Sequence, residues 1–158
     1  MKSIWRYATP IGRVGICEDE GEIMHILFEN QADLVGYAFE ETPLLREAAK
    51  QLTDYFEGKR TAFALPLKLS GTPFQQSAWR ALMQIPYGQT RTYKDIAIAV
   101  GNERAPRAVG MANNRNKIPI VIPCHRVIGS NGKLVGFAGG MDVKQQLLDM
   151  ERTFAQKE

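Results

Sequence analysis

The run that most constrains this fold is Ile-Pro-Ile-Val-Ile-Pro-Cys-His-Arg-Val, from Ile118 to Val127. Its first five residues are apolar and mostly β-branched, which favours a buried β-strand over residues 118–122. Pro123 fixes φ and lacks an N–H, so we expect the strand to break into a turn there. Such a turn brings Cys124 and His125 into one pocket, although direct contact between sequence neighbours is strained.

The adjacent cysteine and histidine are the candidate reactive groups. The thiolate is the reactive form of cysteine, and a nearby histidine is the commonest device for generating it near neutral pH. Because Cys124 and His125 are neighbours, we expect a bridging water to relay the proton. The alternative is a buried structural cysteine beside a histidine bonded to backbone, which is the commoner case for an arbitrary Cys-His pair.

The surrounding residues form a larger pattern. Residues 116–127 and 136–140 closely resemble the O6-alkylguanine-DNA alkyltransferases, whose active-site signature is Pro-Cys-His-Arg-Val. The resemblance extends upstream through Gly71-Thr72-Pro73-Phe74-Gln75-Gln76, Trp79, Ile85-Pro86-Tyr87-Gly88, Thr92-Tyr93 and Arg107-Ala108-Val109-Gly110. It covers nearly all of residues 71–152, whereas the first 70 residues match mainly in length and in a Thr-Pro-Ile-Gly hairpin.

This resemblance implies DNA repair. It predicts irreversible transfer of the alkyl group from O6-alkylguanine, and from O4-alkylthymine, in double-stranded DNA to Cys124 by SN2 displacement. The lesion must first be flipped out of the duplex, because the alkyl carbon is otherwise shielded. The thioether product has no facile hydrolysis route, so each molecule acts once, as a monomeric suicide methyltransferase without a cofactor.

The resemblance also assigns roles to individual side chains. It makes Cys124 the nucleophile, His125 a base acting through water, and Glu151 the group that orients His125. Asn116 ties the DNA-binding helix to the reactive segment. Tyr93 contacts the extruded guanine and helps to rotate its phosphate.

The implied base pocket is made largely of backbone groups. Those of Cys124 and Val127 accept hydrogen bonds from the amine of the base. The N–H near Ala138, in the glycine-rich loop that includes Gly139, donates to the alkylated oxygen. Tyr93 completes this pocket and stabilises charge that develops on the purine.

The position of Glu151 follows from helical periodicity. The last helix, expected over 142–154, has an apolar stripe that includes Val143 and Leu147, and Glu151 lies four residues after Leu147. An inward carboxylate needs a hydrogen-bond donor to offset its desolvation. A helix-end glutamate that swings to solvent fits the periodicity equally well, and the resemblance favours the inward position.

Two helices with a glycine turn between them precede the reactive run. Thr92 and Asp95 have the spacing of a capping box, and Pro106 falls in the first turn of the second helix, a helix-turn-helix pattern. The small residues of this second helix suit either close helix packing or close approach of DNA. By resemblance the helix lies in the minor groove, and its first arginine fills the space of the flipped base. The implied DNA-binding residues are Tyr93, Asn102, Arg107, Ala108, Gly110, Met111 and Arg115, of which Met111 is bulkier than usual at its position.

The expected fold class is α/β, in two domains. Residues 1–70 read as antiparallel strands over 3–9, 13–17 and 23–28, a helix from Pro43 to about Phe56, and a further strand over 63–69. Residues 71–158 read as helices around a short strand. By resemblance the first is a ribonuclease-H-like structural domain, and the second a winged helix-turn-helix-like domain that binds DNA and accepts the alkyl group.

Charge and composition indicate the binding partner, the cellular location and the absence of a metal. Residues 1–70 carry 8 Lys and Arg against 11 Asp and Glu, a net of −3, whereas residues 71–158 carry 12 against 6, a net of +6. A basic half suits a polyanionic partner. Neither a signal peptide nor a membrane-spanning apolar run is present, and the two cysteines suggest no disulfide framework, which predicts a cytoplasmic protein that joins the nucleoid when it acts. Two cysteines and two histidines lack closed metal-ligand spacing, so we expect no metal.

Three other functions compete with this interpretation. A sequence-reading helix-turn-helix regulator needs long side chains for base edges, and the small-residue helix offers few. A cysteine hydrolase acting on small acyl substrates would turn over repeatedly and ignore DNA. A non-catalytic lesion-binding relative would lack the reactive cysteine, which is present here as Cys124.

Overall fold

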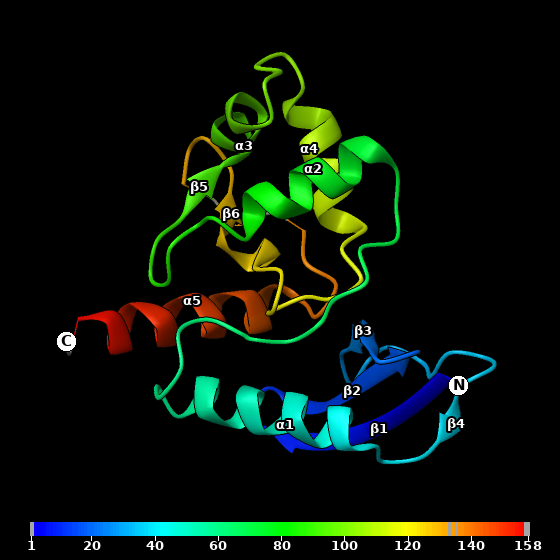
Figure 1. The fold of residues 1–158 in the computed structure, drawn as a ribbon. Helices are drawn as coiled ribbons and strands as arrows, with labels where there is room; N and C mark the ends of the chain where they lie inside the picture. The colour runs from blue at the N-terminus through cyan, green and yellow to red at the C-terminus, as the bar shows by residue number, and fades with distance from the viewer. Residues whose placement is uncertain (1, 133, 135, 157–158) are drawn as a thin grey trace. The chain divides into compact units, whose positions relative to one another are not determined.

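The computed structural model describes residues 2–132, 134 and 136–156 of the 158-residue chain. The chain divides into two compact units, Met1–Leu69 and Ser70–Glu158. The long strands belong to the first unit and most of the helices to the second (Figure 1), so the mixed α/β fold expected from the sequence is confirmed. None of the helices in the described ranges is long and apolar enough to cross a membrane.

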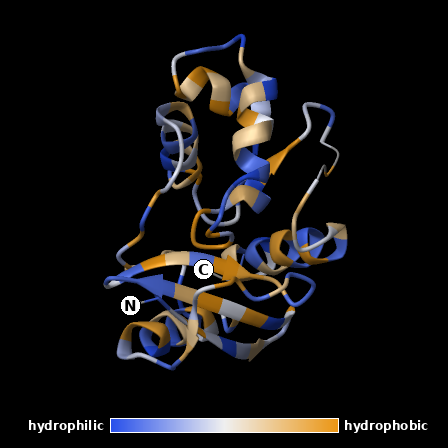
Figure 2. Ribbon diagram, turned by 90° about the vertical axis from the view of Figure 1, so that its right-hand side faces the viewer, coloured by the Kyte–Doolittle hydropathy of each residue, from blue (hydrophilic) through white to orange (hydrophobic). Residues whose placement is uncertain are grey.

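The first unit is a four-stranded sheet with one helix. In the order β3-β2-β1-β4, its strands are β1 (Lys2–Thr9), β2 (Gly12–Asp19), β3 (Glu22–Leu27) and β4 (Ala38–Phe39). The three long strands are antiparallel, as expected, whereas β4 pairs parallel with β1 and was not predicted. Apolar and polar residues are interspersed along these strands (Figure 2), and the sheet buries apolar side chains on both faces, because the neighbours Ile16 and Cys17 of β2 are both fully buried.

The helix α1 (Pro43–Phe56) supplies the other half of this core. It begins where the sequence indicated, with Thr42 as N-cap accepting from the N–H of Leu45 at 3.2 Å and proline in the first turn. The largest buried side chains of this core come from both layers: Ile16, Ile23, Phe28, Leu45, Leu52 and Tyr55. Ile4 belongs to a separate cluster with Cys17 and Leu27. Burial of these side chains is what holds the first unit together.

The strand expected over residues 63–69 is wrong. The segment makes one isolated bridge to β3, where the N–H of Ile23 donates to the carbonyl of Pro66 at 2.8 Å. Pro66 has no N–H, so a regular ladder cannot form through it. The side chain of Gln51 supplies part of the hydrogen bonding that a neighbouring strand would give this segment. Its Nε2 donates to the carbonyl of Ala64 at 3.1 Å, and its Oε1 accepts from the N–H of Ala64 at 2.9 Å.

The second unit is mainly helical. Its helices are α2 (Pro73–Leu82), α3 (Tyr93–Ala99), α4 (Pro106–Asn114) and α5 (Met141–Ala155), with a 3₁₀ turn, η1 (Cys124–Arg126). A two-stranded parallel sheet, β5 (Arg91–Thr92) and β6 (Val127–Ile128), joins the start of α3 to the end of η1. Short strands of two residues carry too little pattern to be predicted from sequence, and this sheet was missed.

The helix-turn-helix pattern is present. The capping box at the start of α3 is confirmed, since Asp95 donates its N–H to Thr92 Oγ1 at 3.1 Å and Thr92 donates its N–H to Asp95 Oδ2 at 2.9 Å. Gly101, with φ of 82°, turns the chain between α3 and α4. Trp79 of α2 donates its indole N–H to the carbonyl of Ala112 at 2.8 Å, which fixes α4 against α2.

The strand expected over residues 118–122 is also wrong, because this segment folds into a compact turn. The N–H of Ile122 donates to the carbonyl of Ile118 at 2.9 Å, and Ile120 has φ of 74°, in the left-handed region. A β-branched residue in that region is strained, at a cost of order 1–3 kcal/mol. The run of apolar residues therefore reflects burial rather than extension, since all five are buried. The prolines within and after the run remove donors that a strand would use.

Candidate active site

Cys124 begins the 3₁₀ turn that follows the buried run. Its residue is only 5% exposed, and its N–H donates to the carbonyl of Ile122 at 2.7 Å. Burial raises the pKa of the Cys124 thiol to about 11, while the Asn116 side chain and the Lys144 ammonium act in the opposite direction. The thiol is therefore protonated at neutral pH in the resting protein, and its reaction requires a base.

His125 can act as a base through a ring nitrogen that has no hydrogen-bond partner among the described residues. Its ring is fully buried, and Nε2 lies 2.7 Å from Oε2 of Glu151. Burial lowers the pKa of His125, so the ring is neutral at pH 7, and a carboxylate can only accept, which places the ring proton on Nε2. Nδ1 then carries the lone pair, and within the described residues it has no hydrogen-bond partner. His125 makes no hydrogen bond to Cys124 there either, so a proton passing between them needs a relay.

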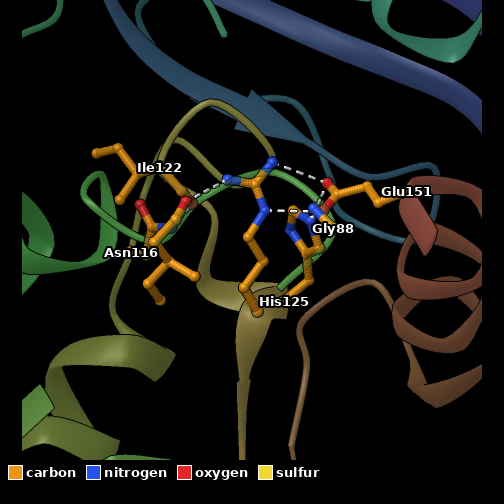
Figure 3. A network of polar contacts seen from close by, with 7 residues as sticks. Gly88, Asn116, Ile122, His125 and Glu151 are labelled. Atoms are coloured by element: carbon orange, nitrogen blue, oxygen red, sulfur yellow. Dashed lines mark hydrogen bonds and ion pairs between the residues drawn. The ribbon is translucent and has the colours of Figure 1, made fainter. Parts of the chain in front are cut away.

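Glu151 points inward from α5 and is 1% exposed. Arg126 holds both of its oxygens, with Nε donating to Oε1 at 2.8 Å and Nη2 donating to Oε2 at 3.0 Å (Figure 3). Burial alone would raise the pKa of Glu151, but the hydrogen bonds and positive charge beside it hold that pKa well below its usual range. The carboxylate is thus ionised and stays ionised when His125 takes up a proton.

Arg126 is a positioning residue that our sequence analysis did not single out. Its Nη1 donates to the carbonyl of Ile85 at 2.9 Å, and its guanidinium lies over the ring of Tyr87, 5.7 Å from the ring centre. The guanidinium thereby connects η1 to the loop after α2 and to Glu151 on α5. The signal was present in the sequence, because an arginine directly after a buried Cys-His pair must find acceptors in the same interior.

Lys144 is a second missed residue. It lies on α5, is fully buried, and its Nζ donates to the carbonyl of Val127 at 2.7 Å. Burial lowers the pKa of Lys144, and the nearby Cys124 acts in the opposite direction. Lys144 precedes Glu151 by seven residues, two helical turns, so the two side chains lie on the same face of α5.

Asn116 holds the buried turn that leads to Cys124. Its Nδ2 donates to the carbonyl of Ile122 at 2.8 Å (Figure 3). Its Oδ1 accepts from the N–H of Ile118 at 3.0 Å. One side chain therefore replaces the strand partner that this segment lacks. It also lies two residues after α4, so it connects the end of that helix to the reactive turn.

An Asn116→Ala protein is expected to lose about 1–3 kcal/mol of unfolding free energy, because two backbone groups of the turn lose their partners. Chemical denaturation of the whole chain measures this change. The exposed neighbour Lys117 provides the control, since Lys117→Ala removes no described bond and should change stability by less than about 0.5 kcal/mol. Equal stability of the two variants would show that Asn116 does not support the turn.

A cavity of about 560 Å³ lies at the start of α3 and along α4. Three residues expected to meet the base or the DNA line it, Tyr93, Arg107 and Gly110, together with Lys94, Pro106, Gly129 and Ser130, which were not predicted. Tyr93 is half-buried, and burial and the neighbouring Cys124 raise the pKa of its phenol. The cavity therefore has the cationic side chains Lys94 and Arg107 on its wall, and Cys124 is not among the residues that line it.

The structure separates the other predicted residues from this cavity. Met111 is 60% exposed, Asn102 and Arg115 are exposed, and Ala108 is half-buried. Val127 is fully buried, and its carbonyl accepts a hydrogen bond from Nζ of Lys144. The remaining two residues of the expected pocket, Ala138 and Gly139, form a turn before α5 and are not among the residues that line the cavity.

Aspartate, glutamate, histidine and cysteine are the side chains that usually bind metal ions in proteins. Across residues 2–132, 134 and 136–156, no three of them are placed to hold a metal ion. Cys17 lies opposite His25 in the β2–β3 ladder and is fully buried, and burial raises the pKa of its thiol to about 12. Cys17 is therefore a poor nucleophile in the folded protein.

Comparison with known protein families gives matches to both units. Residues 73–153 match the family model described as the DNA binding domain of 6-O-methylguanine DNA methyltransferase. Residues 6–69 match the model described as its ribonuclease-like domain. Together these two matches span most of the chain.

Individual relatives are similar over nearly their whole length. The chain is 50% identical to a methylated-DNA–protein-cysteine methyltransferase of Methanosarcina barkeri, covering 90% of this chain and 92% of that protein. It is 51% identical to the constitutive enzyme of that name in Bacillus subtilis, with coverage of 91% and 92%. Among solved structures, the O6-methylguanine methyltransferase of Mycobacterium tuberculosis superposes with a TM-score of 0.90 at 38% identity, covering 97% and 94% of the two chains. A structure of the Mycobacterium tuberculosis protein in complex with DNA gives a TM-score of 0.89 at 40% identity, covering 94% and 92%.

Proposed function

The chain belongs to the 6-O-methylguanine DNA methyltransferase family, and we propose that it repairs double-stranded DNA by transferring the alkyl group of O6-alkylguanine to Sγ of Cys124. The observation that carries this proposal is the pairing of a buried thiol at Cys124 with a neutral His125 whose Nδ1 is unprotonated. O4-alkylthymine presents the same kind of alkyl carbon and is proposed as a second substrate. The protein acts as a monomer, in the cytoplasm and on the nucleoid.

The chemistry begins with removal of the thiol proton. His125 accepts it at Nδ1 through a water molecule, and the resulting imidazolium keeps its Nε2–H on the ionised Glu151. The Lys144 ammonium stabilises negative charge on Sγ while the proton leaves. Because burial raises the pKa of the free thiol, thiolate forms mainly when a substrate is in place to receive its electron pair.

Displacement follows in one step. Sγ of Cys124 attacks the alkyl carbon, the bond between that carbon and O6 breaks, and the electron pair of that bond stays on the purine. The hydroxyl of Tyr93, on the cavity wall, donates a hydrogen bond to the purine and stabilises the charge that develops there. The purine anion takes up a proton, and the His125 imidazolium releases the one that it received from the thiol. The products are therefore a thioether and unmodified guanine, and no step regenerates the thiol.

DNA meets the protein at α4. The residues of α4 that line the cavity are small or basic. The backbone of this helix can therefore lie close to the minor groove of the DNA while the Arg107 side chain reaches into that groove. Net charge of the second half, +6 by residue count, attracts the phosphate backbone without reading sequence. Extrusion of the lesion then brings the alkyl carbon to the Cys124 side of the cavity.

Counting repaired bases tests this proposal. With methylated duplex DNA in excess, the number of O6-methylguanines removed should rise to one per protein molecule and stop. A second addition of protein should remove the same number again, which excludes exhaustion of the substrate. Continued turnover of the first protein dose would contradict the proposal and favour a hydrolytic reaction.

Arg107→Ala should separate base extrusion from chemistry. An arginine that fills the gap left by a flipped base offsets part of the few kcal/mol of unstacking, so repair within duplex DNA should slow by about 10-fold or more. The reaction with free O6-benzylguanine, which needs no flipping, should stay within about twofold of wild type, and single-turnover rates measure both. Arg104→Ala, which removes an exposed cation outside the cavity lining, serves as the charge-matched control. Equal losses on duplex and free base would instead assign Arg107 to the fold or the pocket.

A further inference from the structure

The loop between α2 and β5 contains the sequence Ile85-Pro86-Tyr87-Gly88, to which the mechanism above assigns no function. Gly88 has φ of 80°, in the left-handed region that glycine adopts without strain. Its N–H donates to Oε1 of Glu151 at 3.4 Å, and Gly88 lies beside this carboxylate in Figure 3. The loop therefore contacts the group that orients His125.

The missing side chain of Gly88 lets α5 approach this loop. A Cβ on Gly88 would lie 2.8 Å from Cβ of Ala155 and 3.5 Å from the carbonyl oxygen of Glu151. The first of these distances is well inside the optimal separation of two carbon atoms, about 3.5–4.0 Å. Cβ of Ala155 is attached directly to the helix backbone and cannot turn aside, so α5 and the loop would have to separate. The hydrogen bond from Gly88 is already long and is the contact that such a shift removes first.

Gly88 adds a donor to a carboxylate that serves His125. Oε1 of Glu151 accepts from Nε of Arg126 as well as from Gly88. Oε2 accepts from Nη2 of Arg126 and lies 2.7 Å from Nε2 of His125. Each oxygen of an ionised carboxylate has about two acceptor positions. Two donors on Oε1 restrain rotation of the carboxylate, so Oε2 stays directed at His125.

The same loop also holds Arg126. The carbonyl of Ile85 accepts from Nη1 of Arg126 at 2.9 Å, and the ring of Tyr87 lies under the guanidinium, 5.7 Å from ring centre to Cζ. The loop thus contacts both Glu151 and the arginine that binds it. A displacement of the loop from α5 would disturb the two groups together.

We propose that Gly88 is a positioning residue for Glu151: having no side chain, it lets α5 lie against the loop, and its N–H holds Oε1 so that Oε2 faces Nε2 of His125. A carboxylate that leaves this position no longer stabilises the imidazolium that forms when the thiol proton is taken up. This inference rests on the proposed function, in which His125 is the base, and deepens it. Replacing Gly88 should therefore slow activation of the Cys124 thiol.

The rate at which iodoacetamide alkylates Cys124, measured against pH, tests the proposal. All proteins carry Cys17→Ala, so that one thiol is followed. Gly88→Ala should react about tenfold more slowly at pH 7, because the charged form of His125 loses part of its stabilisation. Toward pH 10 the two rates should converge, because hydroxide then removes the thiol proton without His125. A site that was merely loosened would react faster than the parent protein, since the thiol is 5% exposed in the intact fold.

Two further variants separate the close contact from backbone strain. Gly101 has φ of 82°, and a Cβ there would meet no described atom within 4 Å. Gly101→Ala therefore imposes the same strain without the contact, and its rate should stay within about twofold of the parent protein at every pH. Ala155→Gly removes the atom that a Cβ on Gly88 would meet. In that background Gly88→Ala should slow the reaction by less than about threefold.

Several results would overturn the positioning role. They are a loss that Ala155→Gly does not reduce, equal losses in Gly88→Ala and Gly101→Ala, a loss that persists undiminished to pH 10, a faster reaction, and an unchanged rate. Failure of Gly88→Ala to fold in both backgrounds would also overturn it, because the glycine would then serve the fold alone. These reactions contain no DNA. A wild-type protein that takes no methyl group from DNA would instead refute the proposed function, whatever these rates are.

Discussion

A Cys124→Ser protein is expected to bind methylated duplex DNA like the wild type and to transfer no alkyl group. A serine hydroxyl is a far weaker nucleophile than a thiolate, and loss of a catalytic nucleophile lowers rates on the order of 10⁶-fold in other enzymes. Single-turnover transfer from a labelled oligonucleotide measures the reaction, and electrophoretic mobility measures binding. Binding should persist because the cavity-lining residues of α3 and α4 are untouched.

The other cysteine provides the matched control. Cys17 is fully buried in the sheet of the first unit, and burial raises the pKa of its thiol to about 12. Cys17→Ala should keep full transfer. Retained transfer in Cys124→Ser, or transfer lost only in Cys17→Ala, would show that the alkyl acceptor has been assigned to the wrong residue.

Glu151→Ala is expected to destabilise the protein by about 3–5 kcal/mol. The substitution leaves the guanidinium of Arg126 buried without a counter-charge and deprives His125 of the acceptor at 2.7 Å that sets its tautomer. Chemical denaturation measures the loss, and transfer to free O6-benzylguanine should slow as well. Asp149→Ala, an exposed carboxylate on the same helix, should change stability by less than about 0.5 kcal/mol. Equal stability of the two variants would refute the buried network.

The same network gives stability a defined pH dependence. The pKa of His125 is lowered by burial, so the unfolded chain binds a proton below about pH 6.5 that the folded protein excludes. The pKa of Glu151 is also lowered in the folded protein. Ionised Glu151 therefore stabilises the fold above the pKa that a glutamate has in the unfolded chain, near 4.3, and this stabilisation is lost as the pH falls below that value. Stability should therefore decline from about pH 6.5 downward and more steeply below about 4.5. In Glu151→Gln the steep loss of stability below about pH 4.5 should become smaller. A dependence of stability on pH equal to that of the wild type would contradict an ionised carboxylate at Glu151.

Local signals predicted much of the fold, because the residues that start and stop helices act through their immediate neighbours. Thr92 and Asp95 form the expected capping box, and α1 begins at Pro43 and ends at Phe56 as expected. The periodicity of the last helix set its extent to within a residue at each end. Each of these outcomes depends on spacing along one element, which the sequence displays directly.

Most of the wrong and missed features depend on partners brought together by the fold. An apolar β-branched run at 118–122 is buried either as a strand or as a turn, and here the turn is held by the side chain of Asn116 and favoured by prolines that lack an N–H. The acceptors that bind Lys144 and Arg126 meet these side chains only when η1 and α5 are placed together. The carbonyl of Val127 that holds Lys144 belongs to a two-residue strand, too short to leave a pattern.

Intact mass of the protein after reaction tests the central claim most directly. Wild-type protein incubated with excess DNA containing O6-methylguanine should gain the mass of one methyl group, and peptide mapping should place that group on Cys124. Protein incubated with unmodified DNA should keep its mass. A protein whose mass is unchanged while methylguanine disappears, or a methyl group found on any residue other than Cys124, would contradict the account.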